Sequence, residues 1–157
     1  MQTFLPYASF ERSARVLDTR RLGKQRVEAL QILRALTRPA YGWKHHPAVL
    51  MWSGYEEALV SYAVAVCVEW RNRGHSDTCL EQITAESGVA APRAQDALKE
   101  AGALPPWLGQ RAFHRAHRSA LVRKQPNWYR VHFPNVPDDL PYVWPVPPRP
   151  DRQRSAS

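Results

Sequence analysis

The stretch 20–28 places one acidic residue among several basic ones. If this stretch is helical, Arg21, Lys24 and Glu28 share one face, because residues three, four and seven apart are neighbours on a helix. Basic side chains on such a face can bind phosphates, whereas a carboxylate there weakens that binding, so Glu28 suggests a chemical role such as proton transfer. The alternative is a solvated face held by salt bridges, which is the commoner use of this pattern. The candidate residues are Arg20, Arg21, Lys24 and Glu28.

A second basic segment, residues 111–130, interleaves cationic and aromatic side chains. Cations neutralise phosphates, and flat rings stack on unpaired bases at roughly 1–3 kcal/mol each. This composition fits a nucleic-acid groove, and it fits equally a solvated basic helix followed by aromatic core residues. The candidate DNA contacts in this segment are Arg115, Arg118, Arg123, Lys124, Trp128 and Tyr129.

The histidines suggest two further kinds of site, a phosphate contact and a metal site. His46, directly in front of Pro47, can contact a phosphate or cap a helix, and we count it among the candidate DNA contacts. His114 and His117 lie one helical turn apart and could form half of a metal site, but the chain lacks the converging partners of a zinc pattern. We therefore expect no metal. Without a phosphate-binding glycine loop or a dinucleotide fingerprint, we also expect no organic cofactor.

The charge of the chain narrows the class of partner. Its 157 residues contain 22 lysines and arginines against 14 acidic residues, a net charge of +8, and only four of the 22 are lysines. Arginine is the residue best suited to phosphate forks and to stacking on bases. We therefore expect a polyanionic partner, with nucleic acid favoured over a membrane. The alternative is a basic protein without such a partner.

The two cysteines and the hydropathy pattern bear on the compartment. Cys67 and Cys79 are too few for a disulfide framework, and Cys67 lies in an apolar run typical of a buried thiol. No apolar run is long enough to cross a bilayer, and the first residues lack a signal-peptide pattern. We therefore expect a reduced, cytoplasmic protein that has no membrane contact and acts as a monomer.

Capping and helix-breaking residues divide the first half of the chain. Ser9 can cap a short helix that ends near Leu17, and Asp18 can cap a longer helix that ends near Thr37. Pro47 suits the first turn of a second long helix, which runs to about residue 73 and ends at a glycine. Gly54 is expected to bend or interrupt this helix.

The second half predicts shorter elements. Residues 75–108 are broken by glycines and prolines into short helical pieces, a further helix covers residues 109–123, and residues 125–130 form an aromatic turn. Seven of the 14 prolines lie from Pro134 onward, and the last seven residues are expected to be disordered. Nothing demands a sheet. The expected organisation is a compact all-α domain over residues 1–133 with a Pro-rich extended or disordered tail over 134–157.

Three segments, in order, resemble a known family. Leu17–Glu28 resembles the first long helix of the bacteriophage pyrimidine-dimer DNA glycosylase family, the endonuclease V type. His46–Gly74, with its Cys-x-Glu-Trp-x-x-Arg-Gly ending, resembles that family's second helix. The turn Pro126-Asn-Trp-Tyr129 resembles the family's Pro-x-Trp-Tyr near the C-terminus. The match covers about residues 1–133, and the start Met-Gln-Thr-Phe-Leu-Pro-Tyr is similar to a bacterial and phage branch.

The resemblance implies a fold, an activity and two catalytic residues. The fold is a single domain of three main helices, with the N-terminus tucked between the first two. The activity is repair of damaged double-stranded DNA, by base excision and then strand scission at the abasic site. In that family the α-amine attacks C1′ of the damaged nucleotide and a glutamate on the first helix assists. These roles fall on Met1, which a bulky Gln2 protects from removal, and on Glu28.

The chain also departs from the family at the site. Family arginines one residue before and three residues after the glutamate fall on Val27 and Gln31, and a family histidine falls on Arg21. Arg20, Arg21 and Lys24 can take over phosphate binding, so the contact with the lesion is expected to differ.

The chemistry of a terminal amine supports these roles. An α-amine has a pKa near 7.7–8.0, against about 10.4 for lysine, so more of it is neutral at pH 7. A neutral amine can add to C1′, expel the base and leave an imine without a metal or cofactor. Glu28 can stabilise the positive charge that develops at the sugar and accept the proton lost in β-elimination. Two alternatives stay open: a non-catalytic nucleic-acid-binding protein of the same fold, and a metal-dependent nuclease that uses the histidines.

Overall fold

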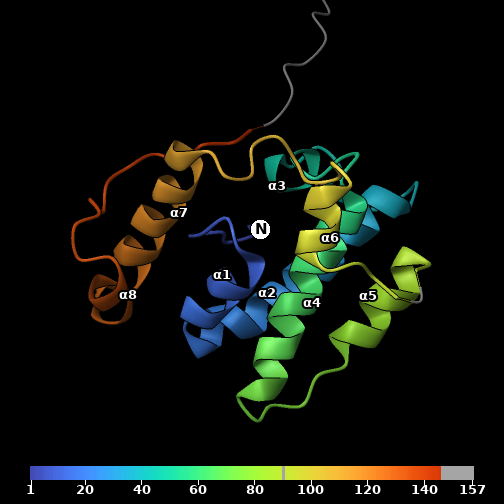
Figure 1. Ribbon diagram of the computed structural model, residues 1–157, viewed down its shortest axis with the longest axis horizontal. Coiled ribbons are helices and arrows are strands. Elements are labelled where there is room, and N and C mark those ends of the chain that lie inside the picture. The colour runs from blue at the N-terminus through green and yellow to red at the C-terminus, as the bar shows by residue number, and fades with distance from the viewer. Residues whose placement is uncertain (90, 146–157) are drawn as a thin grey trace, which may run out of the picture.

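The computed structural model describes residues 1–89 and 91–145, and this part of the chain contains eight helices and no strand (Figure 1). The all-α prediction is therefore confirmed for the described residues. The three longest helices are α2, α4 and α7. The helices are α1 (Phe10–Val16), α2 (Thr19–Thr37), α3 (Pro47–Leu50), α4 (Glu56–Asn72), α5 (Cys79–Ser87), α6 (Gln95–Glu100), α7 (Arg111–Lys124) and α8 (Pro126–His132).

Polar side chains set the starts of the first three helices. Ser9, Asp18 and His46 each accept a hydrogen bond from a backbone N–H in the first turn of α1, α2 and α3, respectively. Such caps satisfy amide groups that a helix start leaves without partners. The predicted starts at Ser9, Asp18 and Pro47 are confirmed.

The second predicted long helix is interrupted, as the glycine in it suggested. Gly54 has φ +85°, in the left-handed region that favours glycine, and it separates the short α3 from the long α4. A second glycine in the same region, Gly74 with φ +91°, follows the end of α4. The chain then turns away into the loop that leads to α5.

The aromatic turn predicted at residues 125–130 is a helix instead. Pro126 occupies the first turn of α8, where its fixed φ and missing N–H are tolerated. Gln125, with φ −149° and ψ 78°, breaks the path between α7 and α8. The prediction of a turn was therefore wrong, because the seven residues that begin with the proline form a helix of their own.

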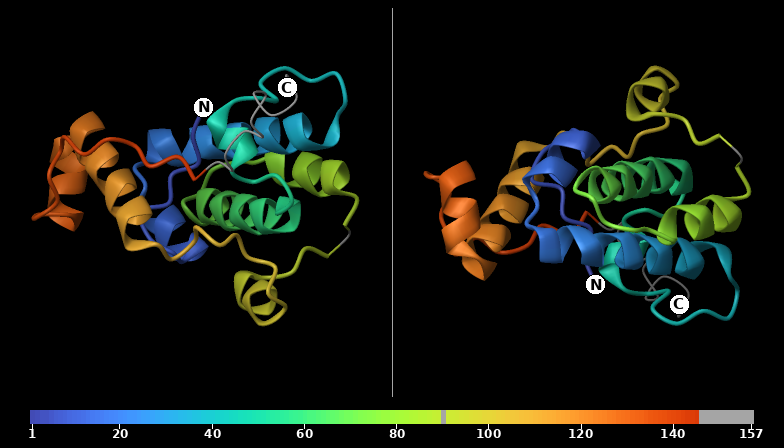
Figure 2. Two further views of the ribbon diagram at one scale, coloured as in Figure 1. Left: turned by 90° about the horizontal axis from the view of Figure 1, so that it is seen from above. Right: turned by 90° about the horizontal axis from the view of Figure 1, so that it is seen from below.

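The core lies between α2 and α4, α5 packs against both of them, and α1 packs against α4 (Figure 2). The largest fully buried side chains include Trp52, Tyr62 and Phe113, from the α3–α4 connection, α4 and α7. Helices α7 and α8 form a pair at one end of the molecule, and the first residues of the chain run between α7 and α4 (Figures 1 and 2). None of the helices in the described part is both long and apolar enough to cross a membrane.

Residues 134–145 contain no helix, yet they follow a defined path from α8 back over α7 (Figure 1). The Arg123 guanidinium donates to the carbonyl of Asp138 at 2.8 Å, and the Leu140 N–H donates to Ser119 Oγ at 3.0 Å. Beyond them, Tyr142 and Trp144 pack against the core. The expectation of disorder for the last seven residues falls outside the described part of the chain.

Candidate active site

The N-terminal segment, residues 2–5, is buried and fixed by side chains of α2, α4 and α7. Gln25 of α2 donates through Nε2 to the carbonyl of Gln2 at 2.9 Å and accepts through Oε1 from the N–H of Phe4 at 2.8 Å. Tyr62 of α4 in turn donates to Gln25 Oε1 at 2.7 Å. Because buried backbone groups need hydrogen-bond partners, this one amide side chain holds the segment in place.

Helix α7 fixes the other end of the segment through two histidines. The N–H of Leu5 donates to Nδ1 of His117 at 2.9 Å. His114 accepts from the N–H of Gly109 through Nε2, so its Nδ1 carries the proton and donates to the carbonyl of Leu5 at 2.8 Å. Burial lowers the pKa of His117 to about 3 and also lowers that of His114, which keeps both rings neutral at neutral pH. The two histidines considered as half of a metal site thus hold backbone groups.

Glu28 meets the N-terminal segment from α2. Its Oε2 accepts from the N–H of Gln2 at 3.3 Å and from Gln25 Nε2 at 3.0 Å. Since consecutive backbone nitrogens are at most about 3.7 Å apart, the amine of Met1 lies within about 7 Å of this oxygen. Among residues 1–89 and 91–145, no cationic group comes within 4.0 Å of the carboxylate. The acid is therefore held by neutral donors, with its second oxygen left open.

A cavity of about 370 Å³ opens beside these groups, and both Met1 and Glu28 line it. Its volume falls in the range of small-molecule sites. Three cationic side chains reach it from α2 and one from the end of α7, so the cavity attracts anions such as phosphate. These four are Arg20, Arg21, Lys24 and Lys124.

The four cations differ in how firmly they are held. Arg21 donates to Asp18 at 3.2 Å and to Gln125 at 2.9 Å, which ties α2 to the junction of α7 and α8. Arg20 and Lys24 are exposed. The Arg21 guanidinium is thus fixed in position, whereas the exposed side chains of Arg20 and Lys24 can adjust to the phosphates of a flexible polyanion.

His46 stands next to the cavity, although it is not among the residues that line it. Partial burial lowers its pKa, the positive charge of the N-terminal amine lowers it further, and the negative charge of Glu28 raises it. His46 therefore lies close enough to both groups to respond to their charges. Its Nδ1 caps α3 by accepting from the N–H of Ala48 at 3.0 Å, so the cap is confirmed, and the phosphate contact stays a prediction.

The remaining predicted DNA contacts are not among the residues that line the cavity. Arg115 is exposed on α7, Arg118 is partly buried, and Arg123 holds residues 138–140. Trp128 is 40% exposed and donates through Nε1 to the carbonyl of Val16 at 2.9 Å. The structure thus does not place these side chains in the cavity that Met1 and Glu28 line.

Tyr129 occupies a structural position. Its ring is fully buried, and its hydroxyl both accepts from the N–H of Asp18 at 2.9 Å and donates to the Asp18 carboxylate. Burial, followed by the hydrogen bond to Asp18, raises the pKa of this phenol well above its usual range. A ring in this position fixes the start of α2 and cannot stack on a base, which corrects the expectation that it contacts DNA.

Sequence reasoning missed four side chains of the site. Gln25 and Gln2 look like ordinary polar residues in the sequence, and only their burial, 1% and 8% exposed, reveals them as part of the framework. The Nε2 of Gln2 is buried without a hydrogen-bond partner in the described part of the chain. Tyr142 and Trp144 line the cavity from the Pro-rich stretch, where no periodic pattern marks them.

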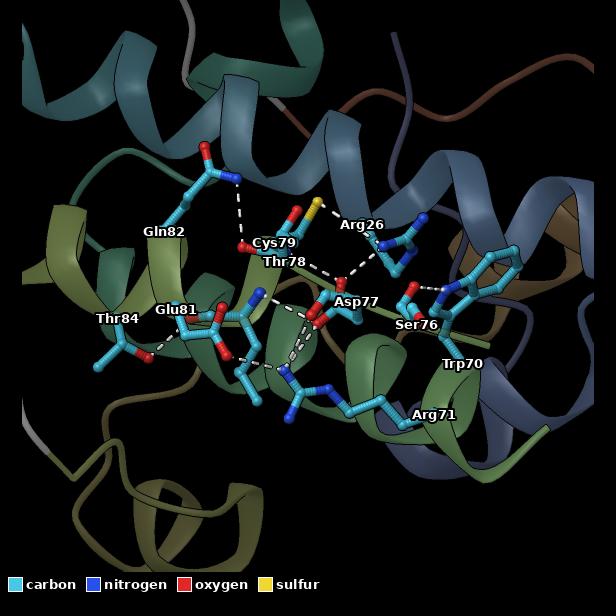
Figure 3. Close-up of polar contacts among 11 residues, drawn as sticks. Arg26, Trp70, Arg71, Ser76, Asp77, Thr78, Cys79, Glu81, Gln82 and Thr84 are labelled. Carbon is cyan, nitrogen blue, oxygen red and sulfur yellow. Dashed lines mark hydrogen bonds and ion pairs between the residues drawn. The ribbon is translucent and has the colours of Figure 1, made fainter. Parts of the chain in front are cut away.

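A second polar cluster is centred on the buried side chain of Asp77, which Arg26 of α2 contacts (Figure 3). The side chain of Asp77 is fully buried and accepts from Arg26 at 2.5 Å and from the backbone N–H groups of Cys79 and Leu80 at 3.0 and 3.1 Å. Arg71 adds an ion pair at 3.3 Å. Burial raises the pKa of this carboxyl, but the hydrogen bonds from Arg26 and the two amides outweigh it, so the pKa lies below its usual range. The cluster joins α2, α4 and the start of α5.

The fold and the site define a small all-helical protein with a cationic cavity at its own N-terminus. Residues 1–82, just over half of the chain, match the family model described as pyrimidine dimer DNA glycosylase. The chain therefore belongs to the pyrimidine dimer DNA glycosylase family, which implies a DNA repair glycosylase with DNA as its substrate. No curated protein and no solved structure matched the chain. The matched region contains Met1, Glu28 and His46, whereas Lys124, Tyr142 and Trp144 lie beyond it.

Proposed function

We propose that this protein is a DNA glycosylase with abasic-site lyase activity, in which the α-amine of Met1 attacks C1′ of a damaged nucleotide. The damaged nucleotide is one of the two that form a pyrimidine dimer in double-stranded DNA, so its base, once cut from the sugar, stays joined to the other base of the dimer. The observation that carries the proposal is the shared cavity of Met1 and Glu28, in which the carboxylate faces no cation of the described residues within 4.0 Å. An acid that stabilised the fold would be paired, as Asp77 is.

The first chemical step is base excision. The neutral amine forms a bond to C1′, and the glycosidic bond breaks with its electron pair going to the departing base. The amine gives up a proton, and the base leaves protonated. Opening of the sugar ring gives an imine between the chain and C1′. Glu28 stabilises the positive charge that develops at C1′ in this step.

The second step is strand scission. Glu28 takes a proton from C2′, the electrons form a double bond between C2′ and C3′, and the 3′ phosphate leaves. Hydrolysis of the imine then frees the amine. The four cations at the cavity, three on α2 and one on α7, hold the flanking phosphates, and extrusion of the nucleotide into the cavity gives the amine access to C1′.

Reductive trapping tests this proposal directly. Borohydride added during reaction with ultraviolet-irradiated or abasic duplex should produce a stable protein–DNA adduct, and peptide mass spectrometry should place it on the amine of Met1. Intact-mass measurement establishes that Met1 is the first residue of the protein used. Full cleavage by a protein whose Met1 amine is acetylated, or an adduct on Lys24 alone, would overturn the assignment.

The same assay separates the alternatives. A non-catalytic member of the fold would bind damaged DNA in a salt-dependent way without base release or nicking. A metal-dependent nuclease would lose cleavage in EDTA, whereas the imine mechanism retains it.

A further inference from the structure

Four arginines without an acidic partner lie on α1 and on one face of α7. Arg12 extends from α1, with its guanidinium carbon 4.1 Å from the centroid of the Tyr7 ring. Arg111, Arg115 and Arg118 follow one another on α7 at spacings of four and three residues, which puts them on the same face of that helix. We call these four arginines the arginine patch.

The arginine patch differs from exposed arginines elsewhere in the chain, which hold acids. Arg38 binds Glu86 at 2.8 Å, and Arg93 binds Glu57 at 2.7 Å. Among residues 1–89 and 91–145, no carboxylate oxygen lies within 4.0 Å of a guanidinium nitrogen of the patch. Guanidinium groups gathered on one surface repel one another and attract anions. The fold therefore keeps a concentration of positive charge here that its own acids do not neutralise.

Arg118 is the member of the patch that is least free to move. It is half-buried, and its Nε is buried without a hydrogen-bond partner in the described part of the chain. Burial lowers the pKa of this guanidinium, nearby Tyr7 raises it, and the charges of Arg115 and Arg111 lower it further. These four side chains are thus close enough to affect one another. A partly desolvated cation gains more from a bound anion than a fully hydrated one does.

The arginine patch and the N-terminal cavity lie on opposite sides of the molecule. Both views in Figure 2 show the N-terminus on one side and α1, in dark blue, on the other. Helix α7 crosses between them, from a start beside α1 to an end on the side of the N-terminus. Lys124, which lines the cavity, comes nine residues after Arg115, so it points about 180° away around the helix axis and lies about 14 Å further along it. A straight duplex at the cavity therefore cannot also cover the patch.

The spacing of the cations on α7 suits a nucleic-acid strand. From Arg111 to Arg118 is about 10.5 Å along the helix axis, and each strand of duplex DNA carries one phosphate per roughly 3.4 Å of its own axis. Three guanidinium groups can thus reach phosphates of one strand, and the fork of donors on each matches phosphate oxygens. An acidic protein would offer no such regular row. DNA is also the substrate that the family implies.

We propose that the arginine patch binds the phosphates of a second DNA segment while the cavity holds the first, so that one molecule bridges the two. This goes beyond the proposed function, because it needs DNA at the cavity but no chemistry there. Arg118 is the fixed member of this second site, whereas the exposed Arg12, Arg111 and Arg115 can adjust to the path of the strand. A protein with two such sites can pass from one DNA segment to another without first leaving the DNA.

A capture experiment tests the bridging. A biotinylated duplex with a tetrahydrofuran abasic-site analogue, which cannot form an imine, is immobilised and saturated with protein, and a fluorescent undamaged duplex is then added. Wild-type protein should retain the second duplex. Arg111→Gln combined with Arg115→Gln should reduce the retained fluorescence on the order of tenfold, and the slope of log affinity against log salt for the second duplex should fall by about 2, because two phosphate contacts are lost.

Arg93→Gln combined with Lys99→Gln is the charge-matched control. It also removes two positive charges from exposed positions, one on α6 and one just before it. Retention of the second duplex should equal that of wild type. Both double variants replace exposed side chains, so thermal unfolding should show that both proteins are folded.

Three results would overturn the proposal. Equal losses in the two double variants would mean that net charge alone retains the second duplex. An equal loss of affinity for the immobilised duplex in the patch variant would place the patch within the footprint of the first duplex. Binding of polyglutamate without retention of the second duplex would assign the patch to an acidic protein.

Trapping by borohydride is scored separately. Retention of the second duplex without trapping removes the amine mechanism alone, and trapping without retention removes the second DNA site alone.

Discussion

Two carboxylates meet helix α2 in opposite circumstances, its own Glu28 and Asp77 of the segment before α5. On the cavity face, Glu28 accepts hydrogen bonds from two neutral donors, and no group of the described residues binds its second oxygen. On the other face, Arg26 holds Asp77, whose side chain is fully buried and bound by a second arginine and two backbone amides. The same basic helix thus supplies an ion-pair partner to Asp77, whereas Glu28 has no cationic partner within 4.0 Å among the described residues.

The difference teaches how to distinguish a structural acid from a reactive one. A buried carboxylate must be paired to offset its loss of hydration, and Asp77 is paired in every direction. A carboxylate that takes up a proton during a reaction needs an unoccupied oxygen and an open approach, and the place of Glu28 in the cavity lining fits the role that we propose for it. Charge in the sequence does not make this distinction, because both acids are accompanied by arginines.

The largest expected effect is on catalysis. Glu28→Gln should reduce single-turnover cleavage of an abasic duplex by about 10²–10⁴-fold, because the amide can still accept from Gln2 but cannot take a proton. The free energy of unfolding should change by less than about 0.5 kcal/mol. Glu100→Gln, at the exposed end of α6, serves as the control and should cleave normally. Unfolding of the Glu28 variant would mean that this acid is structural after all.

The opposite pattern is expected for Asp77→Asn. Loss of one partner leaves Arg26 with an uncompensated charge, so the free energy of unfolding should fall by about 3–5 kcal/mol in urea titrations. Cleavage per folded molecule should stay near the wild-type value. An unchanged free energy of unfolding in this variant would show that Asp77 is not a structural acid, and the contrast with Glu28 would fail.

The stability of the protein should also depend on pH through His117, which holds the N-terminal segment at Leu5. Its pKa is lowered to about 3 in the folded protein, against about 6.5 in the unfolded chain, so the unfolded state binds more protons between these values. Stability is therefore complete above pH 6.5 and should fall by about 2 kcal/mol from pH 7 to pH 5. A His117→Gln variant should lack this component. Urea midpoints of both proteins at pH 7 and pH 5 measure this component. An equal loss of stability between the two pH values in wild type and variant would contradict it.

A smaller loss is expected where α2 packs on α4. A Cβ at Gly23 would stand 2.9 Å from two ring atoms of Trp70, whose indole lies under Arg26 and stacks on His75. Gly23→Ala should cost about 1–2 kcal/mol of unfolding free energy, even though alanine favours the helix. Gly42→Ala is the control, because nothing lies within 4 Å of its Cβ. Equal free energies of unfolding for the two variants would show that the Trp70 ring can move aside at little energetic cost.

The smallest effect concerns the cations of the cavity. Lys124→Ala should weaken binding of duplex DNA a few-fold and reduce the slope of log affinity against log salt by about 1, because one phosphate contact is lost. Lys99→Ala on α6 should leave both quantities unchanged. Fluorescence anisotropy at four salt concentrations provides the slopes, and identical slopes would place Lys124 outside the DNA contact.

Local signals in the sequence were sufficient for the helix starts and for the position of Glu28. Ser9, Asp18 and Pro47 act within one turn of themselves, so their effect needs no knowledge of the rest of the chain. Glu28 and Lys24 share the cavity because helical periodicity alone puts them on one face.

Contacts distant in sequence could not be predicted in this way. Arg26 and Asp77 are 51 residues apart, and no pattern near either one indicates the other. Trp128 and Tyr129 are adjacent and alike in composition, yet the helix turns one outward and the other into the core. Tyr142 and Trp144 reach the cavity only because residues 134–145 cross α7, which depends on packing along the whole stretch.

The anchoring of residues 2–5 has a consequence for when the protein becomes competent. Chain ends usually fray, and ordering each residue costs roughly 1–2 kcal/mol of conformational entropy. Here α2, α4 and α7 must all be assembled before Gln25, Tyr62 and His117 can hold the beginning of the chain. A partly unfolded copy therefore has Met1 on a loose end, remote from Glu28, so the arrangement that we propose for the reaction forms only when these three helices are in place.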